Sequence, residues 1–232
     1  MKKLISLLIA LMPLCLGAKN YEIRAEKSIQ SIVNASEADV ELIYSTTGGN
    51  RIVYSSSEIE APLKVSVSPF GKLTIDTNRK KSYKVSKVKV YYTGKLNEIT
   101  NSGTGDIETG LINTPGELKL INSGTGDLEI SKVNVKKLRI VNSGTGDIEV
   151  KGGKTIDLKV VNSGTGDIEA KVKSSTSDIV NSGTGDISGI RQSTASMKIA
   201  NTGIGKIAVK KQSNGCQVVI APNGSRNVSF VR

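Results

Sequence analysis

A six-residue motif, Asn-Ser-Gly-Thr-Gly-Asp, recurs through the second half of the chain and constrains its fold more than any other feature. Successive copies start 21, 20, 20, 19 and 20 residues apart. A constant period of this length is typical of repeat proteins, in which each repeat forms one structural unit stacked on its neighbours. Five full copies and a degenerate sixth begin at Asn101, Asn122, Asn142, Asn162, Asn181 and Asn201.

Each repeat alternates between apolar and polar residues. From Leu138 to Val150, one set of alternate positions holds Leu, Ile, Asn, Gly, Gly, Ile and Val, whereas the intervening set is polar except for Val141. Alternation with a period of two predicts β-strands with one buried face. We therefore expect the asparagines and the glycines of the motif to be inward-facing and structural, including Gly124, Gly126, Gly144, Gly146, Gly164 and Gly166.

Two architectures accept this pattern. In an antiparallel meander the motifs would be loops between hairpin strands, whereas in a parallel β-solenoid each repeat is one coil, with equivalent residues about 4.8 Å apart. The constant spacing favours the solenoid because it keeps successive coils in register. The inward asparagines would then lie above one another, where we expect a ladder of side-chain amides that satisfy their neighbours. The sequence predicts an all-β parallel solenoid.

The regions flanking the repeats are also predicted to be β-structure. Residues 19–100 lack the motif but contain strand-like segments, so we expect an irregular β part of the same domain. The regular repeats occupy 101–211. In 212–232, two apolar segments surround Pro222-Asn223-Gly224, which predicts a capping hairpin over an open sheet edge. Since no linker separates these parts, residues 19–232 are expected to form one domain.

Residues 1–18 have the three parts of a secretory signal peptide. Two lysines are followed by an apolar run that is too short to span a bilayer, and then by a cleavage zone, Cys15-Leu16-Gly17-Ala18. The mature protein is therefore expected in the periplasm, at the cell surface or outside the cell, with no transmembrane segment. Lipid anchoring through Cys15 is the less favoured alternative, because Leu14 stands where a lipidation motif needs a small residue.

The composition argues against catalysis. The chain has no histidine, and Cys216 is the only cysteine outside the signal peptide, which excludes histidine-based triads, most zinc sites and an internal disulfide. The net charge of +11 suggests a nucleic-acid partner, but the lysines are dispersed and aromatic residues, on which bases stack, are only 3% of the chain. We therefore expect no enzyme activity, no cofactor and no nucleic-acid partner.

Stacked coils would align the acidic residues of the repeats into two surface rows. Like charges at one strand spacing repel, so we expect neighbouring hydroxyl groups or lysines to compensate them. The alternative is a stripe that binds cations or glycans. An evenly repeated row lacks the unique constellation that a catalytic site needs. The two rows are Asp106, Asp127, Asp147, Asp167 and Asp186, and Glu108, Glu129, Glu149 and Glu169.

An apolar row precedes the asparagines. Strict alternation places it on the outer surface, whereas a bend at the asparagine would turn it inward as corner packing, which is the interpretation we favour. On the outer surface it would be a hydrophobic stripe of the kind that marks interaction surfaces. The row consists of Ile121, Val141, Val161, Val180 and Ala200.

Segments outside the motif identify a family likeness. They include Asp39-Val40-Glu41-Leu42, Gly71-Lys72-Leu73-Thr74-Ile75 and Val88-Lys89-Val90-Tyr91. Together with the repeated Ser-Gly-Thr-Gly-Asp-Ile, they resemble the head GIN domain family of auto-transporter adhesins from bacterial cell envelopes. The likeness covers nearly all of the chain beyond the signal peptide. It implies a right-handed β-helix-like fold, export and an adhesive or surface role, and it transfers no catalytic or ligand-binding residue.

The expected function is therefore a non-catalytic binding or adhesion module, with a glycan or another envelope component as partner. A structural scaffold or sensor domain that acts by self-association is the alternative, and a polysaccharide-active enzyme is the least favoured reading. Repeated identical rows favour the first two, because a multivalent surface gains avidity from each copy whereas catalysis does not.

Overall fold

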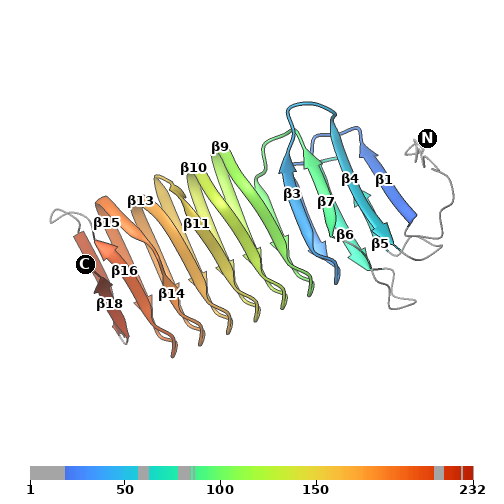
Figure 1. Cartoon of the computed structure of the whole chain (residues 1–232). Helices are drawn as coiled ribbons and strands as arrows, with labels where there is room; N and C mark the ends of the chain where they lie inside the picture. Colours follow the sequence, from blue (N-terminus) through green and yellow to red (C-terminus); the bar gives the residue numbers. More distant parts are fainter. Residues whose placement is uncertain are drawn as a thin grey trace.

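The protein is an elongated all-β molecule (Figure 1). The computed structural model describes residues 19–56, 63–77, 85, 87–211, 217–225 and 227–231. These residues contain eighteen strands and no helix, and the chain winds into a β-solenoid of about six turns. No helix in the described part is long and apolar enough to cross a membrane.

The motif-bearing coils stack in parallel and in register. Leu128 pairs with Ile148, and Asn142 pairs with Asn162 on the next coil. This pairing confirms the predicted parallel solenoid and rules out the antiparallel meander. The strands of these coils are β8 (Glu98–Asn101), β9 (Ile107–Asn122), β10 (Leu128–Asn142), β11 (Ile148–Lys154), β12 (Asp157–Asn162), β13 (Ile168–Asn181), β14 (Ile187–Ser188), β15 (Arg191–Asn201) and β16 (Ile207–Lys211).

Two strand faces of each coil are joined by a motif bend. We call face 1 the strand segment that begins at the Ile or Leu after the motif, and face 2 the segment that ends at the next asparagine. In β10, for example, face 1 begins at Leu128 and face 2 ends at Asn142. The alternation of buried and exposed residues breaks at 131–132 and again at 136–137, where the chain turns from face 1 to face 2 by way of a short segment, 133–135. The motif bends therefore stack along one edge of the solenoid, the motif edge, and these turns stack along the opposite edge, the turn edge.

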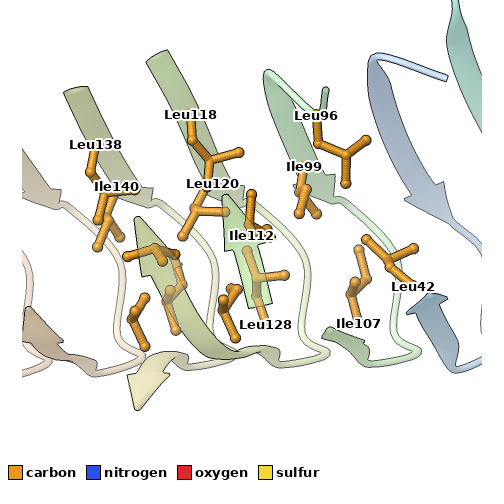
Figure 2. Close-up of a cluster of buried hydrophobic side chains, with 14 of the residues drawn as sticks. Leu42, Leu96, Ile99, Ile107, Ile112, Leu118, Leu120, Leu128, Leu138 and Ile140 are labelled. Carbon is orange, nitrogen blue, oxygen red and sulfur yellow. The ribbon is translucent and has the colours of Figure 1, made fainter. Parts of the chain in front are cut away.

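The thin core lies between the two faces. Alternate residues from Leu138 to Val150, including Asn142 and both glycines of the bend, are buried, whereas the intervening ones are exposed or half-buried. Figure 2 shows Leu118, Leu120 and Ile140 among the side chains that fill the space between the faces. The alternation predicted from the sequence is therefore confirmed over this repeat, and the burial of the aliphatic row stabilises every coil.

The N-terminal part continues the solenoid with its coils out of sequence order. Strand β2 pairs in parallel with both β6 and β8, and β3 pairs in parallel with both β7 and β9. The coil of β2 and β3 is therefore inserted between the coil of β6 and β7 and the first motif-bearing coil. Antiparallel pairs β1–β4, β4–β7 and β5–β6 complete this end. The strands are β1 (Lys19–Ala25), β2 (Ser31–Ala35), β3 (Val40–Tyr44), β4 (Asn50–Ser56), β5 (Leu63–Val67), β6 (Lys72–Thr77) and β7 (Val88–Tyr92).

The predicted C-terminal hairpin is wrong. Strand β17 (Gln217–Ser225) pairs in parallel with β15, and β18 (Val228–Val231) pairs in parallel with β16, so the chain adds a further coil. Pro222-Asn223-Gly224, predicted to be a hairpin turn, lies inside β17 where the register shifts between Ile199 and Asn201. The unpaired groups at the edge of the previous coil offer a ready template for parallel addition, which explains this outcome. The predicted signal peptide and Cys216 lie outside the described residues.

Candidate functional site

The buried asparagine of each motif holds its own bend together. The Asn142 side-chain amide donates to the carbonyl of Gly146 (2.9 Å), and Asn142 Oδ1 accepts from the amide N–H of Gly144 (3.1 Å). The predicted amide ladder is therefore wrong: the side chain is satisfied by backbone groups, which removes the cost of an inward polar residue. The same pair of bonds occurs at Asn122, Asn162 and Asn181.

Close packing of successive bends accounts for the motif glycines. A Cβ atom on Gly144 would lie 2.1 Å from the carbonyl oxygen of Gly124, and one on Gly146 would lie 2.2 Å from that of Gly126. These neighbours are backbone atoms of the preceding coil, so they cannot rotate away as a side chain would. Only glycine fits while the coils keep their spacing, and this holds equally for Gly164.

The aspartates of the motif form a hydrogen-bonded row along the motif edge. Asp127 Oδ1 accepts from the amide N–H of Asp147 (2.8 Å), and Asp147 Oδ1 accepts from that of Asp167 (2.7 Å). Each exposed carboxylate thus ties its coil to the next, which assigns the row a structural role. The first of these bonds runs from the amide N–H of Asp106 to Asp39 Oδ1, and the last runs from the amide N–H of Lys206 to Asp186 Oδ1. Lys206 has no carboxylate and therefore ends the row. A carboxylate that accepts from a backbone N–H is a strong, charge-assisted acceptor.

The glutamates on face 1 are compensated by lysines, as predicted. Lys87 pairs with Glu108 and Lys151 pairs with Glu129, and Lys171 lies 2.9 Å from Glu169 and 3.7 Å from Glu149. Hydrogen bonds to these glutamates raise the pKa of Lys87, Lys151 and Lys171. The pairs are exposed, so each contributes little to stability.

A shallow hollow of about 350 Å³ separates parts of the aspartate and glutamate rows. Within the described part of the chain, no three Asp, Glu or Cys side chains are grouped closely enough to hold a metal ion. The sequence alternative of a cation-binding stripe therefore gains no support from the geometry.

The inserted coil carries a divergent copy of the motif that was not predicted from the sequence. Asn34 donates to the carbonyl of Ala38 (3.0 Å), and Asp39 accepts from the next coil, as their counterparts do. The sequence signal that could have revealed this copy is the spacing Asn-x4-Asp followed by Val-Glu. The repeats have the same spacing followed by Ile-Glu. Ser36 and Ala38 replace the glycines.

The hydroxyl groups of the motifs line a groove of about 1,030 Å³ on the motif edge. Serine and threonine side chains point outward between the buried glycines, in two rows that advance by one strand spacing, about 4.8 Å, per coil. Within the described structure, no hydrogen bond engages the hydroxyls of Thr125, Thr145 or Thr165. The lining of the groove includes Ser102, Thr104, Ser123, Thr125, Ser143, Thr145, Ser163 and Thr165, with Glu37, Asp76 and Thr77 at its N-terminal end.

The apolar row before the asparagines lies on the outer surface of face 2. Val141 and Val161 are half-buried and paired with each other in register, and strand geometry continues through the following asparagines. The corner packing we favoured is therefore wrong, because the bend begins after the asparagine and not before it. Beside this row, Lys159 lies 3.1 Å from Asp178, so acids interrupt the neighbouring basic positions.

Several solved structures share the fold of the chain. A protein described as a "putative adhesin" from Bacteroides fragilis NCTC 9343 is 22% identical, with a TM-score of 0.77 over 93% of this chain and 97% of its own. A "putative adhesin" from Parabacteroides merdae ATCC 43184 is 18% identical, with a TM-score of 0.63 over 93% and 96% of the two chains. A "putative lipid binding protein" from Parabacteroides distasonis ATCC 8503 is 18% identical, with a TM-score of 0.62 over 93% and 97%.

No curated protein matches the chain in sequence. A family model does match it, over residues 29–213, which span the inserted coil and all six repeats. Since that match covers most of the chain, the protein belongs to the family described as "Putative auto-transporter adhesin, head GIN domain".

Proposed function

We propose that this protein is an exported, non-catalytic binding module that recognises an extended glycan along the hydroxyl-lined groove of the motif edge. The observation that carries the proposal is the repetition of unengaged threonine hydroxyls on successive coils of one continuous groove. Family membership supports an adhesion-type role in general terms. The glycan is the more specific part of the proposal.

The chemistry of the groove suits a sugar chain. Each threonine hydroxyl can both donate and accept a hydrogen bond, which matches the hydroxyl groups of a sugar. The glycines between them are buried, so the side chains that face a ligand along the groove are those of the serines and threonines. Identical coils present the same groups repeatedly, and a repetitive ligand that contacts several of them gains avidity.

A lipid is the less suitable ligand for this groove. One structural relative carries a lipid-binding description, but a lipid pocket needs large apolar side chains. The residues that line the groove here are serines, threonines and glycines, with Ala35 as the one aliphatic member and three acidic or hydroxyl groups at its end. The lining therefore favours a polar, hydroxyl-rich chain.

A glycan array, followed by titration of any oligosaccharide that binds, tests the proposal. The double variant T125V/T145V removes two groove hydroxyls and keeps the branched shape of the side chains. If each hydroxyl makes one hydrogen bond to the glycan, the affinity should fall by roughly 30-fold. The control T46V/T47V makes the same change at two exposed threonines between β3 and β4, which do not line the groove, and should bind as the wild type does. No binding to any glycan, or an equal loss in both variants, would refute the proposal.

Self-association is a second candidate function, and the C-terminal coil favours it. Val219, Phe230 and Val231 are exposed there, and in the described structure no strand pairs with the outer edges of β17 and β18. Exposed apolar residues on an open sheet edge favour pairing with another chain. Sedimentation at increasing protein concentration tests this. A constant monomer mass would refute it, and a dimer that the variant V219K/V231K abolishes would support it.

Export is tested by the mass of the N-terminal peptide in envelope fractions. We expect a mature N-terminus near Ala18 or Lys19, which would leave the basic and apolar start of the chain behind. Recovery of a peptide that still begins at Met1 would contradict export by this route, and a lipid on Cys15 would establish the anchored alternative.

A further inference from the structure

Four cationic side chains stack in register near the turn edge of the solenoid, well away from the groove. Lys154 on β11 pairs with Lys173 on β13, which pairs with Arg191 on β15, which pairs with Lys210 on β16. All four side chains are exposed. We call them the cationic row. The strands that carry them belong to four consecutive coils in the C-terminal half of the molecule (Figure 1).

Among the residues that the structure describes, the cationic row has no acidic partner, unlike the lysines beside it. Lys151 and Lys171, on the same strands, form ion pairs with the glutamates of face 1. Within the described part of the chain, no ion pair or side-chain hydrogen bond engages Lys154, Lys173 or Lys210. The nearest acid along β12, Asp157, already accepts a hydrogen bond from the Thr176 hydroxyl (2.5 Å).

This arrangement lowers stability. Like charges placed opposite each other on neighbouring strands repel, and here four of them follow one another at about 4.8 Å. The equivalent position on the two preceding coils holds an uncharged amide, at Asn113 and Asn134, so the fold has no need of a cation there. Folding therefore does not explain the row, whereas a ligand that carries repeated negative charge would.

We infer that the cationic row binds an extended acidic polysaccharide, one whose sugar units carry carboxylate or sulfate groups. The row is straight and spans about 14 Å, the length of three strand spacings. A sugar unit in an extended chain advances by close to one strand spacing, so successive acidic groups meet successive cations. Nucleic acid is a weaker match, because no aromatic residue, on which a base would stack, adjoins the row along the chain. The one aromatic residue of the paired strand β18, Phe230, lies opposite Val209 and not opposite Lys210.

Binding of oligogalacturonate, measured by calorimetry at low ionic strength, tests the inference. The row variant K154Q/K173Q/R191Q/K210Q removes three lysines and one arginine. Exposed ion pairs are individually weak, so the loss of four should lower the affinity by roughly 30-fold. Monomeric galacturonate should bind neither protein, because the proposed site depends on several contacts made together.

The control variant K119Q/R139Q/K159Q/K198Q has the same net charge as the row variant. It neutralises three lysines and one arginine on face 2, where Glu98 and Asp178 occupy the same register positions and interrupt the row. We expect the control to lose less than about threefold in affinity, since only long-range attraction changes. Equal losses in the two variants, or no oligogalacturonate binding at all, would overturn the inference. Equally tight binding of single-stranded DNA that depends on the same row would overturn the polysaccharide assignment.

Two further measurements keep the result interpretable. The row variant should unfold at a slightly higher denaturant concentration than the wild type, because repulsion within the row is relieved; a loss of stability would mean that the stacking has been misjudged. The groove variant T125V/T145V should keep full affinity for oligogalacturonate. The cationic row and the groove are therefore tested separately, and a negative result at one site does not contradict the proposal for the other.

Discussion

Replacing Gly144 by alanine tests the packing of the motif bends. The new methyl group would lie 2.1 Å from the carbonyl oxygen of Gly124, more than 1 Å inside an ordinary contact, and 2.9 Å from the carbonyl carbon of Ser123. A shift of that size would break the bonds from Ser143 N–H to Asn122 O (2.8 Å) and from Thr145 N–H to Gly124 O (3.0 Å). Two lost backbone hydrogen bonds and the residual strain together amount to about 3–5 kcal/mol.

Guanidinium unfolding followed by far-ultraviolet circular dichroism measures this loss, and hydrogen exchange at the Thr145 amide locates it. The control is Gly110→Ala, a glycine in β9 with no atom within 4 Å of the added Cβ, where we expect a change below about 0.5 kcal/mol. A Gly144→Ala protein as stable as the control would contradict close packing of the motif bends, because it would mean that the coils separate without cost.

Three more predictions follow from the contacts. Asn142→Ala leaves the Gly144 N–H and the Gly146 carbonyl unpaired inside the bend, so the free energy of unfolding should fall by about 2–4 kcal/mol in the same denaturation assay; a loss below 1 kcal/mol would argue against this capping role. Asp147→Ala removes an acceptor and should cost about 1 kcal/mol, whereas Asp147→Asn keeps an acceptor oxygen and should cost less; equal losses would show that charge, and not hydrogen bonding, matters. Burial and the neighbouring Tyr21 raise the pKa of Tyr54 to about 12. As the pH rises, this tyrosine therefore ionises in the unfolded chain before it ionises in the folded protein. Its contribution to stability is present below pH ~10 and is lost between pH ~10 and ~12. Tyr54→Phe should therefore reduce the alkaline loss of stability by up to ~2 kcal/mol, and an unchanged pH profile would contradict the shift.

The repeat half of the fold follows from local rules that a sequence displays. Alternation around Leu138 and Ile140 fixes which side of a strand is buried, and a constant period fixes the register of one coil on the next. Both depend on residues close together in the chain, so the sequence sufficed. Compensation of the glutamate row by hydroxyl groups or lysines was also predicted, and lysines provide it, as Lys151 does for Glu129 of the preceding coil.

The features that escaped prediction depend on contacts between distant segments. The inserted coil pairs β2 with β6 and β8 across stretches that no periodicity marks. Its motif at Asn34 was hidden because Ser36 and Ala38 stand in place of the two glycines that mark the repeats. The aspartate row binds the backbone of the following coil, and a sequence shows the carboxylates but not their acceptor geometry.

The groove itself could be predicted only in part. Alternation placed Ser143 and Thr145 on the polar side of the repeat, but whether their hydroxyls were engaged depended on the path of the neighbouring bends. The cationic row could not be predicted from the sequence either. Register shifts at the turn edge make the spacing from Lys154 to Lys173 differ from the spacing from Lys173 to Arg191, so no constant period marks the row. Only the pairing of the strands brings these side chains into one line.

Chemical-shift mapping with a glycan that binds on the array would show directly where on the solenoid the ligand lies. In titrations of isotope-labelled protein, we expect the largest shifts at the amides of Thr125, Gly144, Thr145 and Thr165, which line the groove, and small shifts on face 2. Saturable shifts confined to those bends would support recognition of an extended glycan by the motif edge. Shifts centred on face 2 or on the C-terminal coil, with the motif bends unchanged, would contradict it.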